Sequence, residues 1–199
     1  MKKFYVCSFG GCGSYMLTRA LKSYGKAYHI HSRNPPEKLQ YIGNENGGNT
    51  YFEWFNGKEI PDNEVSDYYV IYIYRNPIHA IYSCYSRFKN RMSQHLKNIQ
   101  TDTTTKFEEI LEKKQDLYGI EEFFDNYTIP NPNRNYKIYC VNYSHIFTKQ
   151  NELSKLLEIG PLNLQNKETK RTYPKSETLE IIYKNLINKM NNMDPIHII

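Results

Sequence analysis

The sequence predicts an α/β protein with one domain, a doubly wound parallel sheet with helices on both faces. Residues 70–74 are β-branched or aromatic with no polar alternation, which is typical of a strand covered on both faces. Asn76 and Pro77 follow at once as an N-cap and a first-turn proline, so a helix begins where the strand ends. A chain of 199 residues suits one domain, over residues 1–199, rather than two.

The N-terminal elements follow the same strand-to-helix pattern. Residues 4–8 form a short apolar strand, and a glycine-rich turn follows it. A helix over residues 15–22 is expected, capped by Ser14 and closed near Gly25. Residues 27–31 predict a second strand, which ends soon afterwards because two consecutive prolines forbid its continuation.

Residues 39–60 are expected to form a hairpin inserted into this pattern. The segment NENGGN predicts a tight turn between two arms, and the second arm is aromatic. Insertions at the carboxyl edge of a parallel sheet often build an acceptor site. Trp54 and Phe55 could stack on a sugar or an aromatic acceptor, although such residues more often cover a core.

The rest of the chain alternates helices with one more strand. The helix that starts at Pro77 is expected to end near Met92. The other expected elements are helices over 106–117 and 120–127, a strand over 136–141 and a last helix over 177–190. The last helix carries an apolar stripe, which indicates core packing rather than a partner site.

Composition narrows the class of partner. A formal net charge of +5 suits an anionic ligand, and also a nucleic acid or a membrane surface. We expect no nucleic-acid binding, since no basic cluster, zinc-ligand spacing or groove-reading helix is recognisable. The four cysteines show no paired spacing, which favours reduced thiols. The absence of a leader or a membrane-length apolar run predicts a soluble cytoplasmic protein.

Two strand-to-helix junctions could each bind an anion. At the second junction, Arg75 lies beside a helix N-terminus, and His79 and Ser83 lie one turn apart on one helix face. Arg75 and Ser83 could therefore hold one phosphate. The alternative is that Arg75 pairs with a structural carboxylate and that Ser83 only fills space.

The first junction is the glycine-rich loop. Gly10, Gly11 and Gly13 let the backbone approach a phosphate, and the amides of Gly13, Ser14 and Tyr15 would point at it. The loop lacks the G-x-x-x-x-G-K-[ST] order, so an ATP-hydrolysing loop is not expected. A cysteine lies within it at position 12, beside a helix N-terminus, and we interpret it as a packing residue rather than a reactive thiol.

With these two sites, the sequence resembles the sulfotransferases that use 3′-phosphoadenosine 5′-phosphosulfate. SFGGCGSYMLTRAL is similar to the loop with which that family binds the 5′-phosphosulfate, and RNPIHAIYS to its 3′-phosphate segment. Two weaker similarities are NYKIYCVNYSHIFTKQNELSKLLEIG, a strand, polar turn and helix, and ETKRTYPKSETLEIIYKNLINKM, the closing loop and last helix. The resemblance implies a P-loop-like sulfotransferase architecture.

The resemblance also implies which residues bind the nucleotide. They are Gly10, Gly11, Cys12, Gly13, Ser14, Tyr15, Arg75, Ser83, Lys170 and Arg171. The sequence departs from the family at two positions: Gly11 stands where a lysine or arginine usually assists the leaving oxygen, and His79 where an aspartate is frequent. Candidates for the missing cation are Arg19, Lys22, Lys170 and Arg171.

Sulfuryl transfer requires alignment of the acceptor hydroxyl, stabilisation of charge on the leaving phosphate and removal of one proton. The expected base is His31, at the carboxyl end of the second strand on the same side as His29, with Glu53 and His95 as reserves. The expected reaction moves a sulfuryl group to a hydroxyl acceptor, a carbohydrate or small molecule, releases adenosine 3′,5′-bisphosphate and needs no metal. Two alternatives stay open: a nucleotide- or glycan-binding protein of the same fold without turnover, and, ranked last, a small-molecule kinase.

Overall fold

The computed structural model describes residues 1–42, 54–88, 92–166 and 173–199, and for residues 54–57 and 86–88 it describes the backbone alone. The described chain is an α/β fold built on a mixed sheet of five strands in the order β2-β1-β5-β6-β7. The strands are β1 (Lys3–Cys7), β2 (Lys26–Ile30), β5 (Tyr68–Tyr74), β6 (Ile138–Asn142) and β7 (Ile196–Ile198). The four strands expected from apolar runs are therefore present.

The sheet is parallel except at one edge. β1, β2, β5 and β6 pair in parallel, whereas β7 pairs antiparallel to β6. The expectation of a wholly parallel sheet was wrong at this strand. The chain returns from its last helix through only four residues, and Ile199 and Ile138 then exchange two backbone hydrogen bonds of 3.0 and 3.1 Å. One residue pair that exchanges both bonds is the antiparallel pattern.

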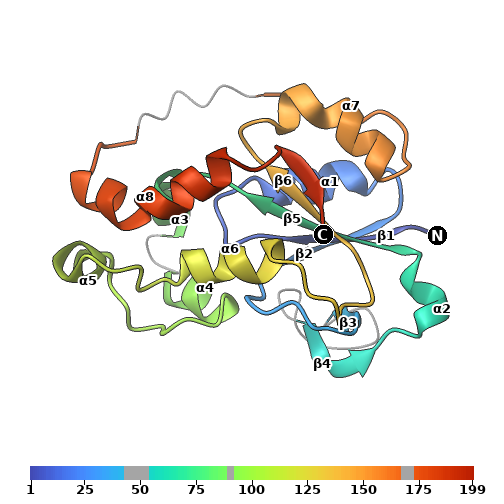
Figure 1. Ribbon diagram of the computed structural model, residues 1–199, viewed down its shortest axis with the longest axis horizontal. Helices are drawn as coiled ribbons and strands as arrows, with labels where there is room; N and C mark the ends of the chain where they lie inside the picture. The colour runs from blue at the N-terminus through green and yellow to red at the C-terminus, as the bar shows by residue number, and fades with distance from the viewer. Residues whose placement is uncertain (43–53, 89–91, 167–172) are drawn as a thin grey trace.

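Helices cover both faces of the sheet, as Figure 1 shows. α1 (Ser14–Leu21) and α7 (Ile146–Leu156) lie on one face and share a core with Phe4, Val6 and Ile71. α6 (Ile120–Thr128) packs on the other face against a second core. Every residue of β5 is buried, as the unbroken apolar run predicts for a central strand.

The helices near the carboxyl edge differ in length from expectation. α3 (Pro77–Phe88) starts as predicted, with the side-chain Oδ1 of Asn76 accepting hydrogen bonds from the amides of Ile78 and His79 at 3.0 and 3.4 Å. Met92 does not end α3 but opens a separate helix, α4 (Met92–Asn98). α5 (Phe107–Lys113) is shorter than predicted, because the next residue takes a left-handed conformation with φ of 52°.

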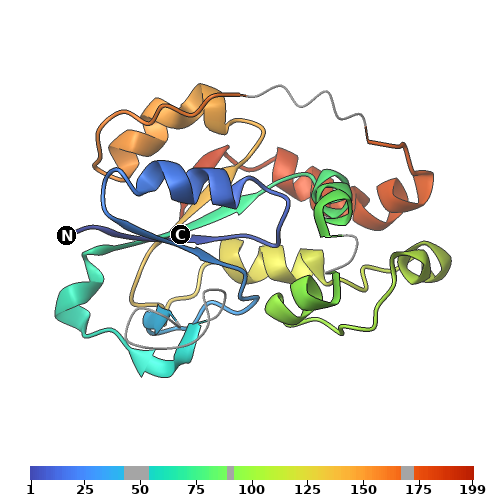
Figure 2. The same cartoon turned by 180° about the vertical axis from the view of Figure 1, so that it is seen from behind.

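An antiparallel pair lies beside the main sheet, where the hairpin was expected. β3 (Gln40–Ile42) pairs with β4 (Trp54–Glu59), and the intervening turn lies outside the described residues. A short helix, α2 (Asp62–Val65), leads from β4 to β5. Figure 2 shows the pair below the strands, seen from the opposite side of the molecule.

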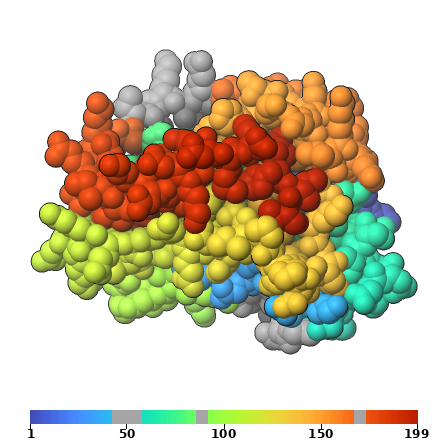
Figure 3. All heavy atoms as spheres, viewed as in Figure 1, coloured from blue at the N-terminus to red at the C-terminus, as the bar shows by residue number. Residues whose placement is uncertain are grey.

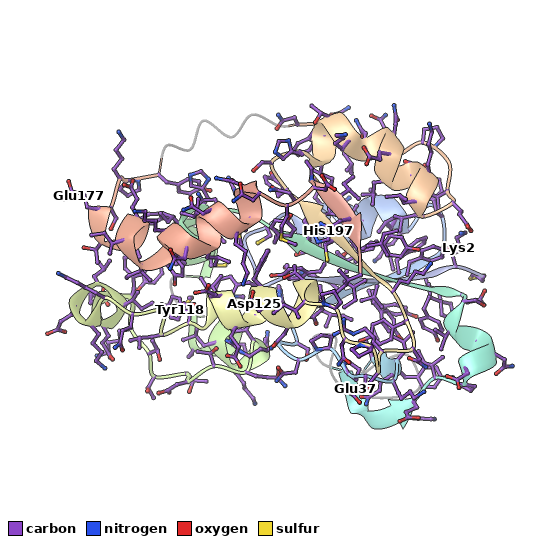
Figure 4. The ribbon with its side chains drawn as sticks, in the orientation of Figure 1. Lys2, Glu37, Tyr118, Asp125, Glu177 and His197 are labelled. Carbon is purple, nitrogen blue, oxygen red and sulfur yellow. The ribbon has the colours of Figure 1, made fainter. Side chains whose placement is uncertain are left out.

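The last helix, α8 (Glu177–Asn191), packs as its apolar stripe predicts. Leu179, Tyr183, Leu186 and Met190 are buried along it. In Figure 3, α8 and β7 form a continuous band over the helices beneath them. Two contacts join α8 to the region of α6: Lys189 pairs with Asp125, labelled in Figure 4, and the Tyr183 hydroxyl donates to Asp116 at 2.7 Å.

Two further expectations concern the whole chain. The described helices include none that is both long and apolar enough to cross a membrane. The four cysteines are free and buried, in agreement with reduced thiols.

Candidate functional site

The two expected anion-binding junctions lie next to each other at the carboxyl edge of the sheet. β1 and β5 are parallel neighbours, and Cys7 near the end of β1 is in register with Tyr72 near the end of β5. From β1 the chain moves outward to β2 on one side, and it later returns to β5 on the other side. The strand order therefore reverses between β1 and β5, and ligands of open α/β sheets bind outside the carboxyl ends of strands at such a point.

The loop after β1 has room for backbone only. Gly10, Gly11 and Gly13 all have positive φ values, of 127°, 67° and 83°. A Cβ on Gly11 would lie 2.5 Å from the carbonyl oxygen of Ala80, and one on Gly13 would lie 2.4 Å from the ring of Tyr143. Successive amides in such a conformation form a concave surface that suits an anion.

The amino end of α1 has Gly13 as its N-cap, and no side chain of the described residues caps it. The prediction that Ser14 caps this helix was wrong, since Ser14 is its first residue. The first intrahelical hydrogen bond runs from the amide of Leu17 to the carbonyl of Gly13, so the three preceding amides, of Ser14, Tyr15 and Met16, lie at the positive end of the helix.

The amino end of α3 differs, because its amides are already satisfied. Asn76 accepts from two of them through its side chain, and its backbone carbonyl accepts from Ala80 at 3.0 Å. An anion at this second junction therefore depends on side chains, whereas an anion at the first depends on backbone amides.

Arg75 is the cationic side chain that joins the two junctions. Its Nη1 donates to the carbonyl oxygen of Gly11 at 3.4 Å. Its guanidinium carbon lies 4.9 Å from the ring centre of Tyr143 and 5.6 Å from that of Tyr173. Within the described part of the chain no carboxylate forms an ion pair with Arg75, so the structural-carboxylate alternative finds no support there.

Ser83 and His79 lie on α3 as their spacing predicts, but at different depths. Ser83 is buried, and its Cβ lies 3.1 Å from the point where a Cβ of Gly11 would be. His79 is exposed, and its ring stacks on Tyr173 with the centroids 5.2 Å apart. Burial and the neighbouring Arg75 charge lower the pKa of His79.

Three histidines meet beside the glycine loop. The rings of His29 and His31 are 4.3 Å apart, and those of His31 and His95 are 5.4 Å apart. His31 Nδ1 lies 2.7 Å from the carbonyl oxygen of Ser8. A carbonyl only accepts, so Nδ1 carries the proton and Nε2 is the basic nitrogen of neutral His31. The ring of His95 packs against Gly10, with its Nε2 3.8 Å from Cys84 Sγ.

Burial keeps these imidazoles uncharged at neutral pH. Desolvation, together with the adjacent His31 and His95, lowers the pKa of His29 to about 3. The pKa of His95 is likewise lowered to about 3, chiefly by burial. Burial also lowers the pKa of His31, whereas the hydrogen bond from its ring to Ser8 raises it.

Arg33, which sequence reasoning did not single out, shows what a structural arginine looks like in this fold. It follows β2, is 5% exposed, and pairs with Glu122 at 3.0 Å. It also donates to the carbonyls of Ile99 at 3.0 Å, Gly119 at 2.5 Å and Tyr118 at 2.7 Å. Arg33 thus ties the end of β2 to the helices below it, and its donors are used up.

The other expected site residues are less informative. Cys12 is buried, its Sγ donates to the Gly10 carbonyl at 3.0 Å, and burial raises its pKa to about 12, as expected of a packing thiol. Lys22 is the C-cap of α1, one helix length from the loop, or about 12 Å at 1.5 Å per residue. Arg19 is exposed and lies over the ring of Tyr15. Glu53, Lys170 and Arg171 lie outside the described residues.

Sequence reasoning missed three members of the site, Ser8, Tyr143 and Tyr173. Ser8 and Tyr143 directly follow the ends of β1 and β6, so their position at the carboxyl edge could have identified them. Tyr173 carries no such signal.

Among the described residues no group of three histidine, cysteine or acidic side chains is arranged to hold a metal. A cavity of about 420 Å³, lined by Asn34, Asn126, Ile129 and Arg134 among others, contains none of the expected site residues.

No protein-family model, curated protein or solved structure matches the chain.

Proposed function

We propose that the protein is a sulfotransferase that takes the sulfuryl group from 3′-phosphoadenosine 5′-phosphosulfate and transfers it to a hydroxyl of a carbohydrate or small molecule. One observation carries the proposal. Arg75 is a half-buried guanidinium without an ion-pair partner among the described residues, and it touches the glycine loop at the point where the strand order reverses. A fixed cation of this kind attracts an anion, and the neighbouring α1 amides supply a second place for one.

The residues present fit such a nucleotide. The α1 amino end and the positive-φ glycines suit the 5′-phosphosulfate, since they present backbone amides with no side chain between them and the group. Arg75, with Ser83 two turns into α3, suits the 3′-phosphate. When bound, the nucleotide supplies the sulfuryl group, and no metal is needed for charge stabilisation.

His31 is the residue suited to remove the acceptor proton. Its Nδ1–H is held by the Ser8 carbonyl, which leaves Nε2 as the accepting nitrogen, and burial keeps the ring neutral. The imidazolium that forms on proton transfer keeps its Nδ1 hydrogen bond, which offsets part of the cost of the buried charge.

A second function, nucleotide binding without turnover, is favoured by a single observation at Gly11. The carbonyl oxygen of Ala80 leaves no space for the usual lysine or arginine side chain at this position. A chain that lacks this cation could bind the nucleotide without turnover. Arg75 is the described cation nearest the loop that could assume the role, so turnover distinguishes the two functions.

Calorimetric and thermal-shift titration with adenosine 3′,5′-bisphosphate tests the proposal, with 5′-AMP and Mg²⁺–ADP as controls. A ligand at a hundred times its dissociation constant adds about 2.7 kcal/mol, which raises the midpoint by roughly 5–10 °C in a chain of this size. Arg75→Ala is expected to weaken binding by about 2 kcal/mol or more. Lys149→Ala, which removes an exposed cation on α7, serves as the matched control.

Three outcomes separate the functions. Stabilisation by the bisphosphate that depends on Arg75, followed by transfer of labelled sulfate to an acceptor, supports the sulfotransferase. The same binding with no transfer to a broad acceptor panel identifies the binding protein. Equal affinities of the parent chain and Arg75→Ala contradict both.

A further inference from the structure

Arg75 is held by aromatic rings rather than by a set of hydrogen-bond acceptors. Its contacts with the rings of Tyr143 and Tyr173, at 4.9 and 5.6 Å, are both within the range of a cation–π interaction. In the described part of the chain its guanidinium donates one hydrogen bond, the 3.4 Å contact with the Gly11 carbonyl. A ring attracts the positive charge without neutralising it, so the charge is kept for a ligand.

Arg33 shows the opposite arrangement. Its N–H groups donate to several backbone carbonyls, and the carboxylate of Glu122 neutralises its charge. A guanidinium has five N–H donors in a rigid fork, which can bind two oxygens of one phosphate at once. Of these two buried or half-buried arginines, Arg75 is the one that keeps most of its fork for an oxyanion.

Tyr143 fixes Arg75 relative to the glycine loop. Its amide donates to the carbonyl of Tyr74, the residue before Arg75, at 2.8 Å. Its ring packs edge-on against Phe147 of α7, with the centroids 5.6 Å apart. The same ring lies against Gly13, where an added Cβ would be 2.4 Å away. One ring therefore contacts both the loop and the cation, and it sets the spacing between the two junctions.

Tyr173 reaches Arg75 from the segment that precedes α8. Its ring stacks on two rings of α3, those of His79 and Tyr82, with centroids 5.2 and 5.9 Å apart. A carboxylate at position 79 would compete with a ligand for the Arg75 charge, whereas a neutral imidazole does not. The replacement of the aspartate that is frequent in sulfotransferases by His79 therefore favours a ring contact over an ion pair.

We infer that Tyr143 and Tyr173 are positioning residues: they hold the Arg75 guanidinium ready for an oxyanion, and Tyr143 fixes its distance from the glycine loop. The inference rests on the proposed function for the identity of the oxyanion, a nucleotide 3′-phosphate. The positioning itself requires only that the two rings hold Arg75 before any ligand binds.

NMR relaxation of the arginine Nε–H groups in the ligand-free chain tests the inference without a nucleotide. The Nε order parameter of Arg75 should be near that of a rigid group, about 0.85, and should fall below about 0.6 in the double variant Tyr143→Leu/Tyr173→Leu. Arg33 is the internal control and should stay rigid in both chains. An Arg75 that is equally rigid without the two rings, or already flexible with them, overturns the inference.

Titration with adenosine 3′,5′-bisphosphate supplies a readout that a merely structural role would not change. Tyr143→Leu and Tyr173→Leu should each weaken binding about fivefold while Arg75 is present, and by less than about twofold in the Arg75→Ala chain. Tyr143→Phe and Tyr173→Phe keep the rings and should retain most of the affinity. Tyr24→Leu removes a half-buried tyrosine beyond the carboxyl end of α1 and serves as the matched control.

The outcomes separate this inference from the proposed function. Equal losses with and without Arg75 would show that the rings support the fold or touch the nucleotide themselves, which overturns the inference and leaves the function standing. If the bisphosphate does not bind the parent chain, the proposed function is wrong, and the order parameters of Arg75 alone decide the inference.

Discussion

The buried histidines predict a loss of stability in mild acid that can be assigned to one side chain. His95 is 4% exposed, and its pKa is lowered to about 3 in the folded state, against about 6.5 in the unfolded chain. The unfolded state therefore binds a proton more readily. The stabilising contribution of neutral His95 is complete above pH 6.5 and declines as the pH falls from 6.5 toward 3.

The size of this stability loss follows from the linkage between proton binding and unfolding. Each pH unit below the unfolded pKa costs about 1.36 kcal/mol per proton, so the 1.5 units from pH 6.5 to 5 cost about 2 kcal/mol for His95 alone. His29, whose pKa is also lowered to about 3, adds a similar amount, reduced somewhat by its partial exposure. Together they remove about 3–4 kcal/mol from a stability that for a domain is roughly 5–15 kcal/mol.

Urea unfolding at pH 7 and pH 5 measures this loss. His95→Gln removes the titration, so the difference in unfolding free energy between the two pH values should shrink by about 2 kcal/mol, whatever the variant costs at pH 7. His145→Gln changes an exposed histidine and should leave that difference as in the parent chain. An unchanged pH dependence in His95→Gln would refute the reasoning, because His95 would then titrate alike in both states.

Three further predictions concern other residues. Gly11→Ala should destabilise the fold by about 1–3 kcal/mol and abolish bisphosphate binding, because φ is 67° and the new Cβ would meet the Ala80 carbonyl; full affinity in calorimetry would contradict this. Arg33→Lys should cost about 3 kcal/mol in urea unfolding, since an ammonium cannot replace the guanidinium fork, whereas Arg19→Lys on the surface should cost under 0.5 kcal/mol. Cys12 should resist alkylation by iodoacetamide at pH 8 in the folded chain, because burial raises its pKa to about 12. Rapid alkylation, detected by mass spectrometry, would show that the thiol is accessible.

The parts of the fold that the sequence predicted are those with a local signal. The central strands are continuous apolar runs, and Asn76–Pro77 marks the start of α3 by its own chemistry. β7 has three residues and no periodicity to separate it from a loop, so its antiparallel pairing depends on β6 lying beside it. Helix ends at Phe88 and Lys113 were missed because a left-handed residue or a second helix start carries little sequence signal.

In the candidate site, too, the sequence predicted only the residues that have a local signal. Arg75 and the glycine loop were recognisable because strand, turn and helix follow one another within a few residues. Arg33 also follows a strand and precedes an Asn-Pro pair, as Arg75 does, but no helix begins there, so the same signal says nothing of its role. The difference lies in Glu122 and the carbonyl of Tyr118, which are distant in sequence and reach Arg33 only through the folding of α6. Whether an arginine after a strand is structural or available to a ligand is therefore decided by tertiary contacts.

The histidine cluster and the glycine loop together explain how this edge of the sheet can combine anion binding with proton removal. A charged histidine would help to hold an anion but could not accept a proton. Here the backbone amides of α1 and Arg75 provide the positive potential, so the imidazoles are not needed for it. Burial keeps His31 neutral, and the Ser8 carbonyl directs its basic nitrogen. Under the proposed function, the group that attracts the anion is thus separate from the group that accepts the proton, as general base catalysis beside a bound phosphate requires.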